Sequence, residues 1–511
     1  MAPGAPAPAG HWWVLGGLCL LLLAPLTLAD VPPLLDYPNH LARLFVLAAN
    51  GSDPILARFY RPHWAAVPNL ALDLTVPPLM RVLPVHTAGR LMVAVVMLLP
   101  VAGAVAYHRA LSGRWSTWPF AAVLFVYNAA LLRGFLNFAA ATGLAMLFAA
   151  AWITWRDRRP TLAIAVAAMG AVVLFFCHLT GLVFFAVLIG AHEAAWLRPG
   201  PFRVGRIAAR ALPDALVFLA PVALYAMSDL GQTRGAAFFR TASDKAAASL
   251  FPVIDYYWPL DLATAALCAG VAVLCLARRW CFVPFQSALA SVILIALFLG
   301  LPHGFKQTFD LDTRFIVMAA VLAPAAPIST RLPRRAASIL GLCFLLLFGL
   351  RMGVVLTVWR NWAVELADFR AVIASVPPGA VVLTVRLPRG TEPSIWATVE
   401  GARRLSDGTV VDAHLPALLL IEHRAWWPFM FDNPSQQPIE TLEPYHTLAD
   451  RTDASPDPIA LLARGAPEMA PYTHVLVMGP APGPDTIATE GLKPVASNGI
   501  ARLFAVVPRA R

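Results

Sequence analysis

Charged side chains are scarce in this chain. Asp, Glu, Lys and Arg together make up 13% of its 511 residues, whereas hydrophobic residues make up 59%. The mean hydropathy is +0.67, far above that of ordinary soluble domains. This composition excludes a soluble globular protein and predicts a membrane protein with many spans.

Lysine is almost absent. Only Lys245, Lys306 and Lys493 occur, so the net charge of +10 is carried mainly by arginine. The arginines are spread over short loops and are not gathered on one domain. This distribution argues against a nucleic-acid partner and is typical of the positively charged cytoplasmic loops of membrane proteins. Together with abundant alanine and proline, it indicates a bacterium with GC-rich DNA.

The cysteines show neither a disulfide framework nor a zinc-site spacing. None has CxxC spacing, and none occurs after residue 357, so they are interpreted as small packing residues. The histidines are too scattered to predict a metal site. A divalent cation, Mg²⁺ or Mn²⁺, bound at Asp36 is left open. The six cysteines are Cys19, Cys177, Cys268, Cys275, Cys281 and Cys343.

Apolar segments long enough to cross a hydrocarbon core of about 30 Å recur as far as residue 356. Eleven spans are predicted, near 12–30, 88–107, 117–133, 138–155, 161–177, 181–197, 211–228, 261–277, 284–301, 314–330 and 337–356. The first could be a cleaved signal peptide, because TLA precedes Asp30. No Lys or Arg precedes this segment, which favours an uncleaved span.

The loops between the spans alternate in their charge. The short arginine-rich loops are predicted to be cytoplasmic, as is the N-terminus. They lie at 108–114, 156–159, 198–210, 277–279 and 330–335. The other loops are predicted to face outward from a bacterial cytoplasmic membrane: 31–87, 133–138, 178–181, 229–260, 302–313 and the part after 357.

Two domains are predicted. Residues 1–356 form the transmembrane helical domain with its long first loop (31–87), and residues 357–511 form an α/β domain outside the cytoplasm. The second domain is more polar and contains β-rich runs and one helical pattern. The strands are expected at 380–385, 473–479 and 501–507, and the helix at 414–423.

Polar residues gather on the outward side. Asp36 follows the first span, and RGFLNF, FFCHLTG and DTRF place polar groups between apolar spans with almost no loop. Ionisable groups at a membrane are costly, and by default they indicate function. A shared polar pocket is favoured over the alternative of separate structural contacts.

The arrangement of an aspartate after the first span, many spans and an outer α/β domain resembles the GT-C superfamily of membrane glycosyltransferases. Among its bacterial members, the protein mannosyltransferases and aminoarabinose transferases are the most similar. Asp36 in LLDYPNH occupies the place of the family's first-loop acid. The paired acids of many members are missing, and the nearest other acids are Asp30 and Asp73. The resemblance implies a sugar carried on a polyprenyl phosphate and a lipid, glycan or protein acceptor.

The residue chemistry fits such a transfer. Asp36 is the candidate base for an acceptor hydroxyl. Cations would bind the phosphate of the leaving group. The candidate cations are Lys306 and Arg314, followed by Arg240, Lys245 and Arg133. The candidate residues for binding the sugar or the acceptor are Asn39, His40, Asp73, Asn137, His178, Tyr256, His303 and Gln307.

Each role has a structural alternative. Asp36 could cap the helix that follows it. His178 could be an interhelical contact, Lys306 could pair with Asp310, and Arg314 could anchor its helix. The aromatic residues of 251–261, which include Tyr256, are typical of an interface belt. The segment HRAWWPFMFDNPSQQPIE (423–440) combines Trp426 and Trp427 with Asp432, Asn433, Gln436 and Gln437. It could dock a domain or, because Trp faces and planar amides suit sugars, bind carbohydrate.

Two other functions are also considered. A transporter or flippase of lipid-linked glycans should place polar residues at mid-membrane on broken helices, often in repeated halves. Here the polar residues lie at one end of the spans and no internal repeat is evident, which favours the enzyme. An envelope assembly protein whose outer domain binds a partner is the third alternative.

Overall fold

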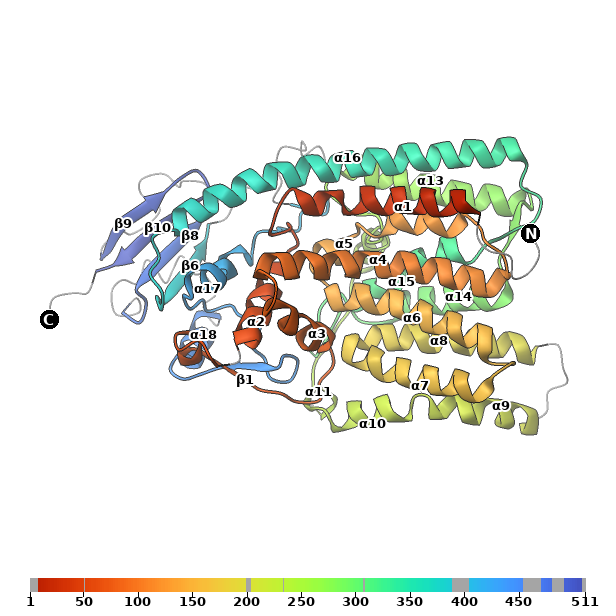
Figure 1. The fold of residues 1–511 in the computed structure, drawn as a ribbon, viewed down its shortest axis with the longest axis horizontal. Helices are drawn as coiled ribbons and strands as arrows, with labels where there is room; N and C mark the ends of the chain where they lie inside the picture. The colour runs from red at the N-terminus through yellow and green to blue at the C-terminus, as the bar shows by residue number, and fades with distance from the viewer. Residues whose placement is uncertain are drawn as a thin grey trace.

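The computed structural model describes residues 8–49, 51–198, 204–232, 234–306, 308–387, 404–453, 470–479 and 491–507. The chain is mostly helical, and the long helices run side by side along the longest axis of the molecule (Figure 1). The N-terminus lies at one end of this bundle, and the C-terminal strands lie beyond the other end. We call the latter the tail end.

Among the described residues, seven helices are long and apolar enough to cross a membrane. They are α1 (Ala9–Leu23, continued by the 3₁₀ turn η1, Ala24–Thr27), α4 (Val85–Ser112), α6 (Leu136–Trp155), α7 (Pro160–Cys177), α8 (Leu179–Leu197), α13 (Trp258–Ala277) and α16 (Arg334–Ile373). An eighth span arises if α9 (Val204–Leu216) and α10 (Leu219–Met227), bent by 47° at their junction, are counted together.

The other three predicted spans are helical but shorter, so the count of eleven is not confirmed. They are η3 (Trp118–Phe125) with α5 (Ala129–Leu132), α14 (Phe285–Gly300) and α15 (Thr313–Ala325). The first is broken at Asn128, whose side chain caps α5 by accepting a hydrogen bond from the Leu131 N–H. An apolar composition therefore identified these segments, although it did not predict where each helix ends.

Helices α4 and α6 form the centre of the bundle, and they approach closely at Gly143. A Cβ atom there would lie 2.2 Å from the carbonyl carbon of Leu99 on α4. Only glycine permits this contact between the two backbones. The start of α6, which carries Asn137, is thereby held against the middle of the molecule.

The first long loop contains two helices, α2 (Tyr37–Ala49) and α3 (Ala71–Met80), and both lie at the tail end (Figure 1). Between them are the 3₁₀ turn η2 (Leu56–Arg58) and the short strand β1 (Tyr60–Pro62). The apolar face of α2 is buried, so this loop is a folded part of the protein.

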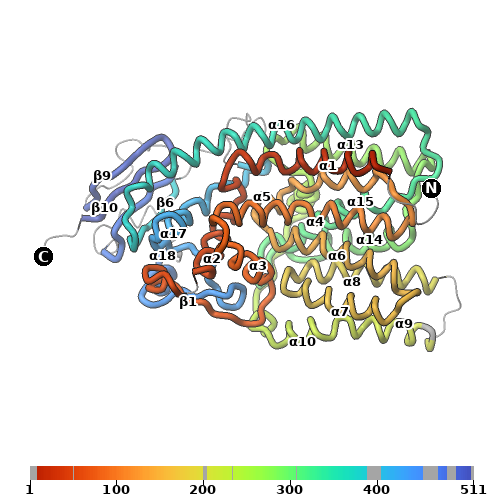
Figure 2. Tube along the Cα trace, in the orientation of Figure 1, coloured from red at the N-terminus to blue at the C-terminus, as the bar shows by residue number. Residues whose placement is uncertain are grey.

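Helix α16 has 40 residues, which at 1.5 Å per residue is about 60 Å. It leaves the bundle and continues to the C-terminal strands (Figure 2). The predicted domain boundary at residue 357 therefore lies inside a continuous helix. Burial explains the continuity, because Trp359, Trp362, Leu366 and Phe369 are all buried.

The described part of the C-terminal region contains a four-stranded sheet in the order β6-β8-β10-β9. Strand β6 (Val382–Arg386) runs parallel to β8 (His474–Met478), whereas β10 (Ala501–Val506) is antiparallel to both β8 and β9 (Leu492–Ser497). The three predicted strands are confirmed. The predicted helix is also present, as η4 (Leu415–Ala417) and α17 (Leu418–His423). The polar strand β9 was not predicted.

The C-terminal region is joined to the first loop. Strand β1 pairs antiparallel with β7 (Ile439–Thr441), which is followed by α18 (Tyr445–Asp453). The Asn39 side chain on α2 donates to the Phe429 carbonyl at 2.8 Å and accepts from the Phe431 N–H at 2.9 Å. These bonds hold the C-terminal region against α2.

Six smaller elements complete the described fold. At the tail end, α11 (Asp229–Gln232), β2 (Ala237–Phe238) and α12 (Ala242–Ala248) precede α13, and β2 pairs with β4 (Gly304–Phe305). Strand β3 (Cys281–Phe282) pairs with β5 (Ile328–Ser329) between α13 and α16.

Candidate functional site

Asp36 is positioned by backbone contacts with the turn before α6. The Leu35 N–H donates to the Leu132 carbonyl at 2.9 Å, and the Asp36 N–H donates to the Arg133 carbonyl at 3.2 Å. Gly134 lies in the left-handed region, with φ of 89°, and a Cβ atom there would be 2.8 Å from the Asp36 nitrogen. The RGFLNF turn therefore needs glycine to pass this close to Asp36.

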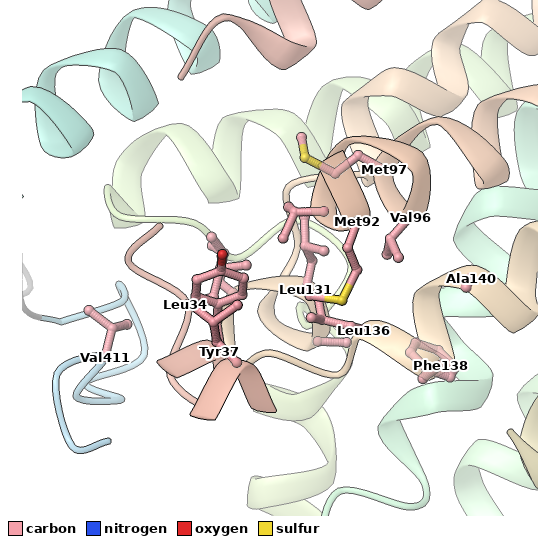
Figure 3. Close-up of a cluster of buried hydrophobic side chains, with 14 of the residues drawn as sticks. Leu34, Tyr37, Met92, Val96, Met97, Leu131, Leu136, Phe138, Ala140 and Val411 are labelled. Atoms are coloured by element: carbon pink, nitrogen blue, oxygen red, sulfur yellow. The ribbon is translucent and has the colours of Figure 1, made fainter. Parts of the chain in front are cut away.

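Beneath this contact lies apolar packing. Figure 3 shows Leu34 and Tyr37, which flank Asp36 closely in sequence, in one buried cluster with Met92, Leu131 and Leu136. All five side chains are buried. The backbone that carries Asp36 is therefore fixed on a rigid base of packed side chains.

A cavity of about 650 Å³ opens beside Asp36. Its lining residues come from the first loop, the RGFLNF turn, the α7–α8 junction, the segment before α15, and the C-terminal region. Seven of the fourteen predicted site residues line it: Asp36, His40, Arg133, Asn137, His178, Lys306 and Arg314. The shared polar pocket expected from the sequence is present.

The Asp36 carboxylate is 18% exposed, and its nearest ionisable partner is His414 of the C-terminal region, with Nδ1 3.3 Å from Oδ1. Burial raises the pKa of Asp36 to about 7, and the charge of Asp310 also raises it, against the lowering effects of Arg133, Arg314 and Arg43. In the described parts of the chain, this carboxylate accepts no hydrogen bond from the first turn of α2. The capping alternative is therefore not what the structure shows.

Arg314, at the start of α15, is buried against the cavity. Its Nη1 lies 2.8 Å from His178 Nε2, so that nitrogen accepts a hydrogen bond from the guanidinium. The guanidinium carbon also lies 5.0 Å from the centre of the Phe135 ring. His178 therefore makes an interhelical contact, as its structural alternative predicted. This contact holds Arg314 at the cavity.

Lys306 has an unusual backbone conformation for a non-glycine residue, with φ of 48°. Its Nζ donates to the carbonyls of Leu230 at 2.8 Å and Gly231 at 3.2 Å, and it does not pair with Asp310. Within the described ranges, no carboxylate lies within 4.0 Å of the charged nitrogens of Lys306 or Arg314. Both cations therefore border the cavity without an ion pair to a described carboxylate.

The other three predicted phosphate ligands are already paired. Arg133 contacts Asp310 at 2.5 Å, Asp407 at 2.7 Å and Thr409 Oγ1 at 2.9 Å. Arg240 contacts Asp310 at 2.6 Å and Asp312 at 3.2 Å, and Lys245 contacts Asp312 at 2.6 Å. Arg240 and Lys245 do not line the cavity. Their predicted role is corrected to a charge network that joins the segments before α13 and α15.

Four predicted sugar-binding residues also lie away from the cavity. Asp73 is fully buried, with Oδ1 2.7 Å from Arg43 Nε. Asn39 holds the C-terminal region, and the Tyr256 hydroxyl lies among buried groups, 3.2 Å from Trp359 Nε1. His303 lies 3.4 Å from Asp310. Gln307 is outside the described residues.

The sequence did not identify His414, which contacts Asp36 without lining the cavity. The segment 423–440 was considered as a carbohydrate-binding alternative, and six of its residues line the cavity: Met430, Phe431, Asp432, Asn433, Gln436 and Gln437. Trp426 and Trp427 are each only 1% exposed, so they pack inside the protein and present no face to a sugar. The unusual composition of 423–440 indicated that this segment has a role. It did not show that Trp426 and Trp427 are buried whereas residues of 430–437 line the cavity.

No group of three or more His, Cys, Asp or Glu side chains suited to a metal ion occurs in the part of the chain that the structure describes.

No protein-family model, curated protein or solved structure matches this chain. The function is therefore argued from the geometry of the cavity.

Proposed function

We propose that this protein is a glycosyltransferase. It moves a sugar from a polyprenyl phosphate to an acceptor at the outer face of a bacterial cytoplasmic membrane. The observation that carries the proposal is the position of Asp36, whose pKa is about 7, in the same cavity as Lys306 and Arg314. A base with a pKa near the working pH and a pair of phosphate-binding cations are the two requirements of this reaction.

In the proposed reaction, the Asp36 carboxylate takes the proton of the acceptor hydroxyl. The acceptor oxygen forms a bond to the anomeric carbon as the bond from that carbon to the phosphate oxygen breaks. The electron pair leaves with the lipid phosphate, so the anomeric configuration inverts. Lys306 and Arg314 stabilise the phosphate because neither makes a direct ion pair with a described carboxylate.

The position of the cavity supports an enzyme over a transporter. Asp36 follows the first span, Arg133 and Asn137 flank the start of α6, and Arg314 lies at the start of α15. These residues therefore lie at the ends of helices, whereas a transport site is expected between discontinuous helices near mid-membrane.

The test of Asp36 uses a deletion strain that carries the wild-type gene, Asp36→Asn or Asp450→Asn. Asp450 is a suitable control because its side chain is 72% exposed on α18. Mass spectrometry of envelope glycans and polyprenyl-phosphate sugars should show loss of one sugar substituent and accumulation of its donor in the deletion. Asp450→Asn should restore the profile, and Asp36→Asn should not, at equal levels of inserted protein. Restoration by Asp36→Asn would contradict the base role and favour the transporter or assembly alternatives.

The phosphate site can be tested by binding alone. Purified protein in detergent is titrated with a polyprenyl phosphate, and the bound fraction is measured by native mass spectrometry. Lys306→Met should weaken binding about tenfold or more, as expected for the loss of one charge-assisted contact. Lys493→Met, which removes an exposed lysine on β9, is the matched control and should bind like the wild type. Equal binding by both variants would exclude Lys306 as a phosphate ligand.

A further inference from the structure

The lining of the cavity differs in chemistry from one segment to another. The transmembrane domain with its first loop supplies the cations Arg43, Arg133, Lys306 and Arg314. Among the described residues that line the cavity from the C-terminal region, none is a cation. That wall instead presents the carboxylate of Asp432 and the amides of Asn433, Gln436 and Gln437.

The amide wall is built on an ordered turn. The N–H groups of Gln436 and Gln437 donate to the Asn433 carbonyl at 2.9 and 2.8 Å, and the Ser435 N–H donates to Asn433 Oδ1 at 3.0 Å. Strand pairing of β7 with β1 starts directly after the turn, at Ile439. The backbone bonds hold the turn without using the side chains of Gln436 or Gln437, which leaves both amides for another role.

The wall is also continuous with Asp36. The Phe431 ring lies edge-on to the His414 ring, with centroids 5.0 Å apart, and His414 in turn lies 3.3 Å from the Asp36 carboxylate. The His40 ring, one turn along α2 from Asp36, is 5.5 Å from the same Phe431 ring. A molecule held by the turn at 433–437 therefore lies on the Asp36 side of the cavity.

The hydrogen-bonding groups of the two walls suit different ligands. A phosphate only accepts hydrogen bonds, which matches Lys and Arg. A hydroxyl both donates and accepts, which matches an amide, and its donated bond also suits a carboxylate. The cavity volume of about 650 Å³ lies in the range of small-molecule sites, so it suits a chain of sugar rings better than a folded protein surface.

We infer that Gln436 and Gln437 bind the hydroxyl groups of a carbohydrate acceptor and place one of them at Asp36. This inference rests on the proposed transfer function and names the acceptor class that the proposal leaves open. It assigns the segment 430–437 two tasks: its apolar residues pack against His414 and His40, and its amides recognise the acceptor.

The experiment compares the wild type, the double variant Gln436→Leu/Gln437→Leu and Gln286→Leu, a matched change at the start of α14 outside the cavity lining. Membranes from each strain receive envelope polysaccharide extracted from the deletion strain, and the rate of sugar incorporation is measured against polysaccharide concentration. The KM for the polysaccharide should rise at least tenfold in the double variant and stay unchanged in Gln286→Leu.

Polyprenyl phosphate binding by the purified double variant should equal that of the wild type, which shows that the cavity is folded and the cation wall is intact. Gln437→Glu, which keeps hydrogen-bond acceptors at the same position, should recover part of the affinity for the polysaccharide. An unchanged KM in the double variant would overturn the role of the turn. A sugar substituent found on protein and absent from polysaccharide would overturn the acceptor class. Neither result depends on Asp36→Asn, whose activity alone decides the proposed function.

Discussion

The Nδ1 atom of His414, in the C-terminal region, lies 3.3 Å from Oδ1 of Asp36, in the first loop. His414 is itself buried enough that its pKa falls to about 4, with a further lowering effect of the Arg386 charge. The ring is therefore neutral at neutral pH, and it covers the carboxylate without neutralising it. This contact connects the two parts of the chain at the proposed base.

The first prediction concerns pH. Because the pKa of Asp36 is raised to about 7, the carboxylate form needed for a base is the major form only above that pH. The rate of transfer at low acceptor concentration should rise with pH and level off above about 7. A transfer rate that rises and levels off below pH 5 would contradict the role of Asp36 as the base.

The same shift affects stability. A carboxyl group in an unfolded chain has a pKa of about 4, so between about pH 4 and 7 the folded protein binds more protons. The free energy of unfolding should therefore fall as pH rises through this window, and the fall should be smaller in Asp36→Asn. Thermal unfolding in detergent across the window provides the measurement.

The second prediction concerns His414. Its contact with Asp36 is one of packing, because the buried Nδ1 of His414 has no hydrogen-bond partner among the described residues.

 Removing the His414 ring should let water reach the Asp36 carboxylate more easily. His414→Ala should lower the pKa of Asp36, so that the transfer rate rises at a lower pH. His414→Phe, which keeps water out, should leave this pKa near 7. A shift of this rise to higher pH in His414→Ala would show instead that His414 donates a hydrogen bond to the carboxylate.

The third prediction concerns Gly134. Its φ of 89° disfavours any side chain, and an added Cβ would meet the Asp36 backbone at 2.8 Å. Gly134→Ala should destabilise the protein by more than the roughly 1–2 kcal/mol that a left-handed conformation alone costs. It should also reduce transfer, because the turn can no longer hold Asp36.

Gly190→Ala is the matched control for this change. Gly190 lies inside α8, and an added Cβ there meets nothing within 4 Å. Alanine in a helix interior is favoured over glycine, so this variant should be at least as stable as the wild type. Thermal unfolding of both variants in detergent compares them directly. Equal stability of Gly134→Ala and the wild type would contradict the close approach at Asp36.

The fourth prediction concerns the buried ion pair of Arg43 on α2 and Asp73 on α3, whose side chains are 2% and 0% exposed. Arg43→Met leaves the Asp73 carboxylate buried without its partner, and it should cost about 3–5 kcal/mol of unfolding free energy. The double variant Arg43→Met/Asp73→Leu should recover most of that loss because no buried charge remains. If the double variant is less stable than Arg43→Met, the pair does not act as an isolated buried charge pair.

Much of the fold was predictable because its signals are local. A long apolar segment is a sum over adjacent residues, and each of the eleven predicted segments is helical in the structure. The strands at β6, β8 and β10 were predicted in the same way, from short runs of apolar and β-branched residues. The lengths of the helices were less predictable, as the 40-residue α16 shows, because burial against the C-terminal region decides where that helix ends.

The candidate site was only partly predictable. Asp36, Arg314 and His178 were recognised because each is a polar residue beside an apolar span. The pairing of Arg240 and Lys245 with Asp310 and Asp312 could not be read from the sequence, because the partners are distant in the chain. A cation looks the same in sequence whether or not an acid neutralises it.

The sequence by itself determined that the chain forms apolar helices with polar groups collected at one set of helix ends, since hydropathy and charge depend on each residue and its near neighbours. Only the tertiary structure decided which of these groups meet. It paired Arg240 and Lys245 with acids, left Lys306 and Arg314 facing a cavity, and brought His414 to Asp36. The physical reason is that ion pairing and burial act through space, and both depend on how distant segments pack.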